Sequence, residues 1–94
     1  MAKIVVNDEK QAFWFCNQSG WVGQIAHSLE EFANQIKIVP TDCLEFHLRD
    51  DKNDFEAWLY NVLKEKRLAK KIAKIKKQGL KGEELRKALI SLFE

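Results

Sequence analysis

The feature that most constrains the fold is the spacing of the apolar side chains that follow Asn53. They recur at positions i, i+3, i+4, i+7 and i+8, as Phe55, Trp58, Leu59, Val62 and Leu63. This spacing places side chains on one face of an α-helix. The sequence therefore predicts an amphipathic helix that begins after Asn53, whose side chain can cap it.

Cap and stop signals predict two helices before this one. Ser28-Leu29-Glu30-Glu31 fits a capping box. In that motif the Ser28 hydroxyl accepts from the Glu31 amide and the Glu31 carboxylate accepts from the Ser28 amide. Val39-Pro40 is expected to end this helix, and Thr41 is expected to cap the next one.

Two further helical patterns follow residue 63. A stripe of Leu68, Ile72 and Ile75 ends at Gln78-Gly79, which is a helix-stop signal. A last helix is expected to start at Glu83, with an apolar face formed by Leu85, Ala88, Leu89, Leu92 and Phe93. The pattern leaves open whether residues 64–78 continue the helix over 55–63 or fold back on it.

The first third of the chain is expected to form β-structure. Residues 12–16 and 21–26 are extended runs rich in aromatic and β-branched side chains, and turn-forming residues separate them, which is typical of a hairpin. Residues 3–6 form another β-branched run, and Gly23 predicts a bulge. The predicted fold class is α+β: an N-terminal β-hairpin or small antiparallel sheet packed on four to five helices, with an all-helical C-terminal part.

The chain of 94 residues, 46% of them hydrophobic, is expected to form a single domain. Its parts are a β-rich region (1–27), a helical core (28–63), and a basic helical arm with the final helix (64–94). No signal peptide is visible, and no apolar run approaches the roughly 20 residues of a membrane span. Cys16 and Cys43 are expected to be free thiols in the cytoplasm, with a single bridge left open.

Charge is unevenly distributed along the chain. Residues 1–63 hold five Lys and Arg against ten Asp and Glu, a net −5. Residues 64–87 hold eleven basic residues against three acidic ones, a net +8, and Glu94 brings the total to +2. Such asymmetry indicates an anionic partner, although a solvated helix face would produce it as well.

The basic residues of this arm recur with helical spacing. They are Lys66, Arg67, Lys70, Lys71, Lys74, Lys77 and Lys81. A helix that carries them can bind nucleic-acid phosphates, lie on an anionic membrane, or present a solvated surface. Because lysine predominates over arginine, non-specific charge attraction is favoured over the reading of bases.

A second candidate site is the polar joint between two predicted helices. Its members are His47, Arg49, Asn53, Asp54 and Trp58. In a functional interpretation, His47 titrates near neutrality and Arg49 binds an anion. In the structural alternative, Asn53 and Asp54 satisfy helix amides. Arg49 then pairs with Asp50 or Asp54, and a half-buried His47 donates to a backbone carbonyl.

Signals for catalysis are weak. Cys43 and His47 lie at i and i+4, but a zinc site needs two more ligands, and no CxxC or HxxxH pattern accompanies them. No orienting group can be assigned to a Cys-His pair, and the four glycines form no phosphate loop. We therefore expect no enzyme, no metal and no cofactor.

An aromatic group in the predicted hairpin has two interpretations. Trp14, Phe15 and Trp21 would stack nucleic-acid bases if they were exposed. Aromatic residues are more often part of the core. We expect core positions, with at most one of the three exposed.

The most specific motifs are Phe46-His47-Leu48-Arg49 and Asn53-Asp54-Phe55-Glu56-Ala57-Trp58. Together with the strand, cap and helix patterns from about Phe13 to Leu92, they resemble a prokaryotic family catalogued as a domain of unknown function, number 5752. The resemblance implies a small accessory or binding domain and assigns no activity.

The sequence thus predicts a non-catalytic binding module that engages an anionic partner, namely DNA, RNA or a ribonucleoprotein, through its basic helix. The alternative is a protein–protein adaptor. It would use the acidic joint from His47 to Asp54 or the final amphipathic helix with Leu85, Leu89, Leu92 and Phe93.

Overall fold

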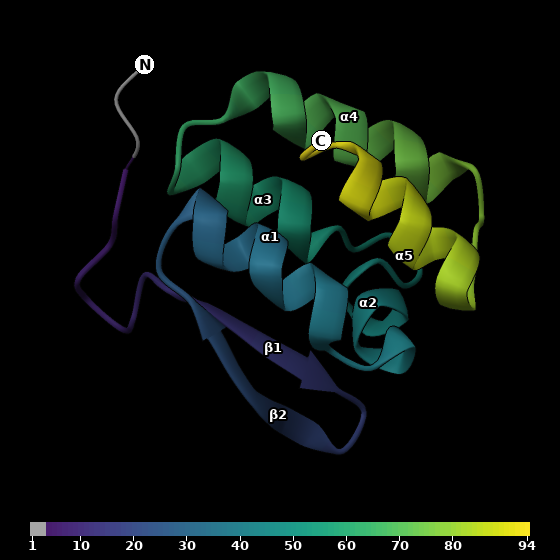
Figure 1. Cartoon of the computed structure of the whole chain (residues 1–94), viewed down its shortest axis with the longest axis horizontal. Helices are drawn as coiled ribbons and strands as arrows, with labels where there is room; N and C mark the ends of the chain where they lie inside the picture. Colours follow the sequence, from purple (N-terminus) through teal and green to yellow (C-terminus); the bar gives the residue numbers. More distant parts are fainter. Residues whose placement is uncertain (1–3) are drawn as a thin grey trace.

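The computed structural model describes residues 4–94 (Figure 1). Two strands, β1 (Phe13–Asn17) and β2 (Gly20–Ala26), are followed by the helices α1 (Leu29–Ile38), α2 (Thr41–His47), α3 (Asp54–Asn61), α4 (Lys66–Lys77) and α5 (Gly82–Ser91). The predicted α+β fold, a hairpin followed by helices, is confirmed.

The helices cover one face of the hairpin. Helix α1 packs on β2 and α2 packs on β1, while α4 packs on α3 and α5. Helix α4 lies at the end of the molecule opposite the hairpin (Figure 1). The two strands and the basic helix are therefore separate surfaces.

The hairpin is antiparallel and contains the expected bulge. Phe13 pairs with Ala26 and Phe15 with Gln24, and the register then shifts so that Cys16 pairs with Trp21. Gly23 lies within this irregularity at φ +93°, a conformation that favours glycine. Of the expected strand over residues 3–6, only Val5 pairs, in a single bridge to Ser28. Lys3 lies outside the described residues.

Aromatic side chains form the centre of the core. Phe13 lies 5.3 Å from Phe55 between ring centroids, and Phe32 lies 5.2 Å from Phe55. Phe15 is fully buried beside them. The indole N–H of Trp58 donates to the carbonyl of Gln11 at 2.7 Å, so the core also anchors the segment before β1. This cluster joins the inner face of β1 to α1 and α3.

The predicted helix caps are confirmed in part. Asn53 accepts from the Glu56 amide at 3.0 Å, as expected. The Ser28 hydroxyl accepts from the Glu31 amide, but the Glu31 carboxylate accepts from the amide of His27 instead of that of Ser28. The prediction of Thr41 as a cap is wrong. Pro40 already has the φ of −57° and extended ψ of a cap residue, so Thr41 is the first helical residue.

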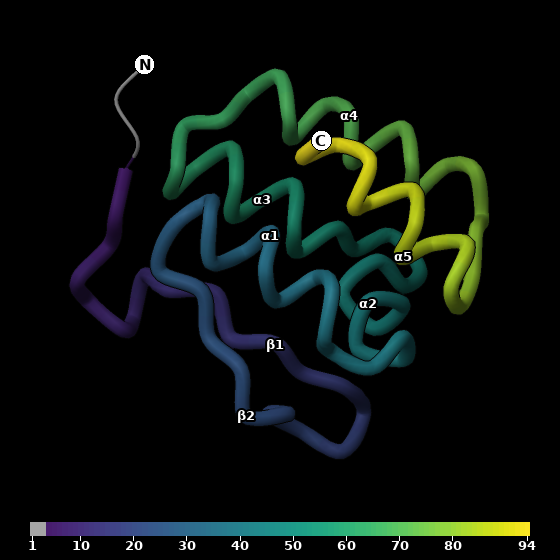
Figure 2. The backbone as a smooth tube through the Cα atoms, in the orientation of Figure 1, coloured from purple at the N-terminus to yellow at the C-terminus, as the bar shows by residue number. Residues whose placement is uncertain are grey.

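The chain folds back after α3. Lys64 adopts φ +60°, and the Glu65 amide donates to the carbonyl of Leu59 at 2.8 Å. A left-handed residue cannot continue an α-helix. Figure 2 shows α4 returning along α3, which answers the question that the apolar spacing left open.

Candidate functional site

Helix α4 presents a continuous basic surface. Ala69, Ile72 and Ile75 are buried toward the core. The opposite side carries six exposed cations, here called the basic face: Lys66, Arg67, Lys70, Lys71, Lys74 and Lys77. Twelve residues make a helix roughly 18 Å long. Because its apolar side is packed, the helix holds these cations on a rigid backbone.

The charges of the basic face are not paired with acidic side chains among the residues that the structure describes. Among residues 4–94, ion pairs join His27 to Glu31, His47 to Asp54 and Arg86 to Glu83, and none involves α4. The face also makes a contact with an aromatic ring. The Lys66 ammonium nitrogen lies 5.6 Å from the centroid of Tyr60. The positive potential of this face is thus directed toward solvent.

His47 is buried at the end of α2, with 4% of its surface exposed. Its Nε2 accepts from the backbone N–H of Cys16 at 2.9 Å, so the ring proton must lie on Nδ1. Nδ1 then donates to the Asp54 carboxylate at 2.9 Å. Burial lowers the pKa of His47, against the opposing effect of Asp54. The ring is therefore a neutral link between β1 and α3.

The expected partners of His47 and Arg49 are both wrong. His47 donates to a carboxylate and accepts from an amide, and it does not donate to a backbone carbonyl. Arg49 does not pair with Asp50 or Asp54. Its Nη1 donates to the carbonyl of Phe46 at 2.6 Å, and its guanidinium lies 3.9 Å from the centroid of the Phe46 ring. The ring and the carbonyl of Phe46, in the last turn of α2, hold the side chain there.

The polar joint is therefore not one pocket. His47 and Asp54 are brought together, Asn53 caps α3, and Trp58 is buried in the core. Arg49 contributes to a different surface. The other four residues of the joint connect β1, α2 and α3, so their role is structural.

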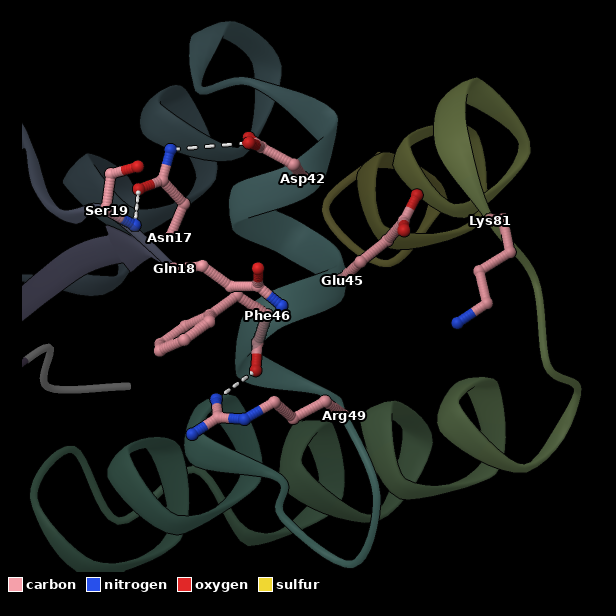
Figure 3. A pocket seen from close by; sticks show the side chains of 8 residues that line it. All are labelled: Asn17, Gln18, Ser19, Asp42, Glu45, Phe46, Arg49 and Lys81. Atoms are coloured by element: carbon pink, nitrogen blue, oxygen red, sulfur yellow. Dashed lines mark hydrogen bonds between the residues drawn. The ribbon is translucent and has the colours of Figure 1, made fainter.

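Lys81 does not belong to the basic face. It precedes α5 and lines an open hollow of about 400 Å³, here called the α2 groove. The other lining residues are Asn17, Gln18, Ser19, Asp42, Glu45, Phe46 and Arg49 (Figure 3). The groove thus follows the exposed side of α2, between the turn of the hairpin and the start of α5.

Sequence reasoning missed this groove because its lining comes from three distant segments. Hydrogen bonds connect them. Asn17 donates to Asp42 at 3.3 Å, and the Gly82 amide donates to the Glu45 carboxylate at 2.8 Å. No spacing within any one segment indicates that Lys81 and Arg49 share a surface.

The cysteines offer no metal site. Cys16 and Cys43 are both free thiols. Burial raises the pKa of Cys43 to about 12, which keeps it protonated at neutral pH. Over residues 4–94, no group of three or more His, Cys, Asp or Glu side chains is arranged to hold a metal ion.

Two of the three hairpin aromatics are exposed, so the expectation of at most one is wrong. Trp14 is 39% exposed and Trp21 is 52% exposed, whereas Phe15 is buried. The two indoles lie 5.1 Å apart on the outer face of the hairpin, and their N–H groups donate to the carbonyls of Glu9 and Gln24. The helices cover only the inner face, so the alternation along β1 leaves Trp14 outside.

A comparison with family models identifies the family of the chain. A family described as a family of unknown function (DUF5752) matches residues 2–94. The chain belongs to this family. The resemblance of the chain to this family is thereby confirmed. No curated protein and no solved structure matches the chain. In the part of this family member that the structure describes, no helix is long and apolar enough to cross a membrane.

Proposed function

We propose that the chain is a non-catalytic binding module that engages a nucleic acid, free or within a ribonucleoprotein, through the basic face of α4. The observation that carries the proposal is the exposure of six cations on one packed helix, none of which forms an ion pair within residues 4–94. A regular row of phosphates is the anionic surface that such a row of charges complements best.

The composition of the face favours backbone contact over base reading. Five of its six cations are lysines, which act as point charges, and Arg67 is the one guanidinium that can form a fork with a base or phosphate. The exposed Trp14 and Trp21 belong to β1 and β2. The hairpin lies at the end of the molecule opposite α4 (Figure 1), so stacking of bases does not contribute at this face. We infer binding that depends on charge and only weakly on sequence.

The geometry of His47 supports a non-catalytic role. A general base needs a free ring nitrogen within reach of a substrate. Both nitrogens of His47 are engaged, by Cys16 and by Asp54, and the ring is buried.

The alternative adaptor function has fewer side chains to use. Leu85 and Leu89 of the final helix are buried in the core, and Leu92 and Phe93 pack partly against it. At the acidic joint, Asp50 and Asp51 remain exposed, but His47 does not. The basic face is therefore the better supported binding surface.

The test is titration of the protein onto labelled duplex DNA and duplex RNA at 50 and 200 mM salt. If five of the six cations contact phosphates, the slope of log affinity against log salt is about −4.5, and affinity falls about 500-fold over this range. A Lys70→Glu, Lys71→Glu, Lys74→Glu variant should lose binding.

The matched control changes Lys10, Lys37 and Lys52 to Glu. These lysines are exposed outside α4. Both triple variants change the net charge from +2 by −6, to −4, so any difference between them reports on position alone. Equal losses in the two variants, or no binding at 50 mM salt, would refute the proposal. An absence of binding at 50 mM salt would mean that the basic face is a solvated surface, and it would favour a protein partner instead.

A further inference from the structure

The α2 groove is a charged surface separate from the basic face. Its two carboxylates already have partners within the chain. Glu45 accepts from the Gly82 amide at 2.8 Å, at the start of α5, and Asp42 accepts from Asn17 at 3.3 Å. Each acid is thereby fixed in position, and each keeps accepting capacity, because a carboxylate has about four lone-pair sites.

The two cations of the groove have unused donors. Arg49 carries five N–H groups, and its hydrogen bond to Phe46 uses one of them. Within residues 4–94, Lys81 makes no ion pair and no side-chain hydrogen bond. Figure 3 shows the Lys81 side chain on the side of Glu45 that faces the start of α5, with no hydrogen bond drawn to its ammonium. The groove therefore offers free cationic donors to a ligand that carries oxygen acceptors.

The side-chain conformation of Arg49 is also fixed before a ligand binds. Its contact with the Phe46 ring and its bond to the Phe46 carbonyl restrict a long side chain that would otherwise lose rotamer freedom when it captured a ligand. Such preorganisation raises affinity by lowering the entropic cost of association. Charge-assisted hydrogen bonds from guanidinium to an oxyanion are among the stronger polar contacts.

The balance of charge selects the class of ligand. Asp42 and Glu45 contribute −2 and Arg49 and Lys81 contribute +2, so the lining sums to zero. A phosphate dianion would leave the groove with a net −2, whereas a zwitterion leaves it neutral. One acid and one base are also separated along α2. Asp42 lies in the first turn of α2, and Arg49 follows its last turn.

We propose that the α2 groove binds a zwitterionic carboxylate of the amino-acid or short-peptide class. Arg49 and Lys81 hold its carboxylate, and Asp42 faces its ammonium group. The volume of about 400 Å³ is in the range of small-ligand sites. This site is independent of nucleic-acid binding, because Arg49 and Asp42 do not lie on α4.

The test is an NMR titration of the ¹⁵N-labelled full chain at constant ionic strength. The probes are glycine, triglycine, triglycine amide, N-acetyl-triglycine and inorganic phosphate. We expect glycine or triglycine to shift the signals of Ser19 and the Arg49 side chain saturably. The amide and acetyl probes each lack one charge and should bind about tenfold more weakly or worse. Tighter binding of triglycine than of glycine assigns the site to peptide termini, and the reverse assigns it to free amino acids.

Three variants distinguish a built site from general attraction. Arg49→Gln and Lys81→Gln should each weaken the preferred probe about tenfold or more. Lys81 is exposed, so its variant tests the site without altering the turn that Arg49 contacts. Arg67→Gln, on the basic face, should leave the titration unchanged. No saturable shift up to about 20 mM would overturn the proposal, since sites with Kd near 1 mM are then filled. Equal binding to the Lys81→Gln variant, or phosphate binding tighter than triglycine, would overturn it too.

Discussion

Acidification should destabilise the fold through His47. A proton added to the folded ring would go to Nε2, because Nδ1 already holds one and donates it to Asp54. Nε2 accepts from the Cys16 amide at 2.9 Å. A proton on Nε2 would therefore replace this hydrogen bond with two N–H groups that point at each other. Burial, the largest cause, lowers the pKa of His47, and the nearby Arg49 charge acts in the same direction.

The direction and size of the effect follow from linkage. In the unfolded chain His47 has a pKa of about 6.5, and in the folded chain its pKa is lower. The stability contributed by the neutral ring is therefore complete above about pH 6.5 and is lost as the pH falls toward the folded pKa. One proton limits the slope to about 1.4 kcal/mol per pH unit, and the loss between pH 7.5 and 5.5 to about 1.4 kcal/mol.

The assay is urea unfolding at pH 7.5 and pH 5.5, followed by tryptophan fluorescence and circular dichroism. The unmodified chain should lose free energy of unfolding on acidification, up to the limit above. A His47→Gln variant should be less stable at pH 7.5 and nearly insensitive to pH in this range. A His27→Gln variant should keep the acid-dependent loss, because His47 remains in place. An acid-dependent loss in His47→Gln equal to that of the unmodified chain would refute the reasoning, as would a gain of stability in the unmodified chain.

Two further predictions concern stability. Asn53→Ala removes the acceptor for the Glu56 amide at the start of α3 and should cost about 0.5–2 kcal/mol in urea unfolding, whereas an Asn53→Asp variant should retain most of the stability. Gly23→Ala meets no steric obstacle but forces a side chain onto φ +93°, so it should cost about 1–2 kcal/mol. An unchanged urea midpoint for Gly23→Ala would mean that the bulge relaxes.

The helices and their ends could be predicted because their causes are local. The apolar spacing that starts at Phe55 and the Asn53 cap lie within a few residues of each other, and both are reproduced in α3. The helix ends at Asn61, so the last two members of the predicted stripe, Val62 and Leu63, follow it. Gly23 marked the bulge for the same reason, since a positive φ is a property of one residue. The predicted N-cap of α2 was wrong by one position, because Pro40 occupies the cap position that was assigned to Thr41.

Exposure could not be predicted from local pattern. The strand alternation places Trp14 and Phe15 on opposite faces, but it does not say which face the helices cover. Only the packing of α1 and α2 on the hairpin buries Phe15 and leaves Trp14 in solvent. The cations of α4 were correctly assigned to one face, because helical periodicity alone separates them from Ile72 and Ile75.

The sequence by itself determined the α+β order of elements, the caps of α1 and α3, and the charge carried by α4. These depend on residues less than two helical turns apart. Only the tertiary structure decided that His47 meets the amide of Cys16, 31 residues away, and that Arg49 and Lys81 line one groove. Such contacts arise when separate elements pack, and the geometry of that packing depends on the shape of the whole core.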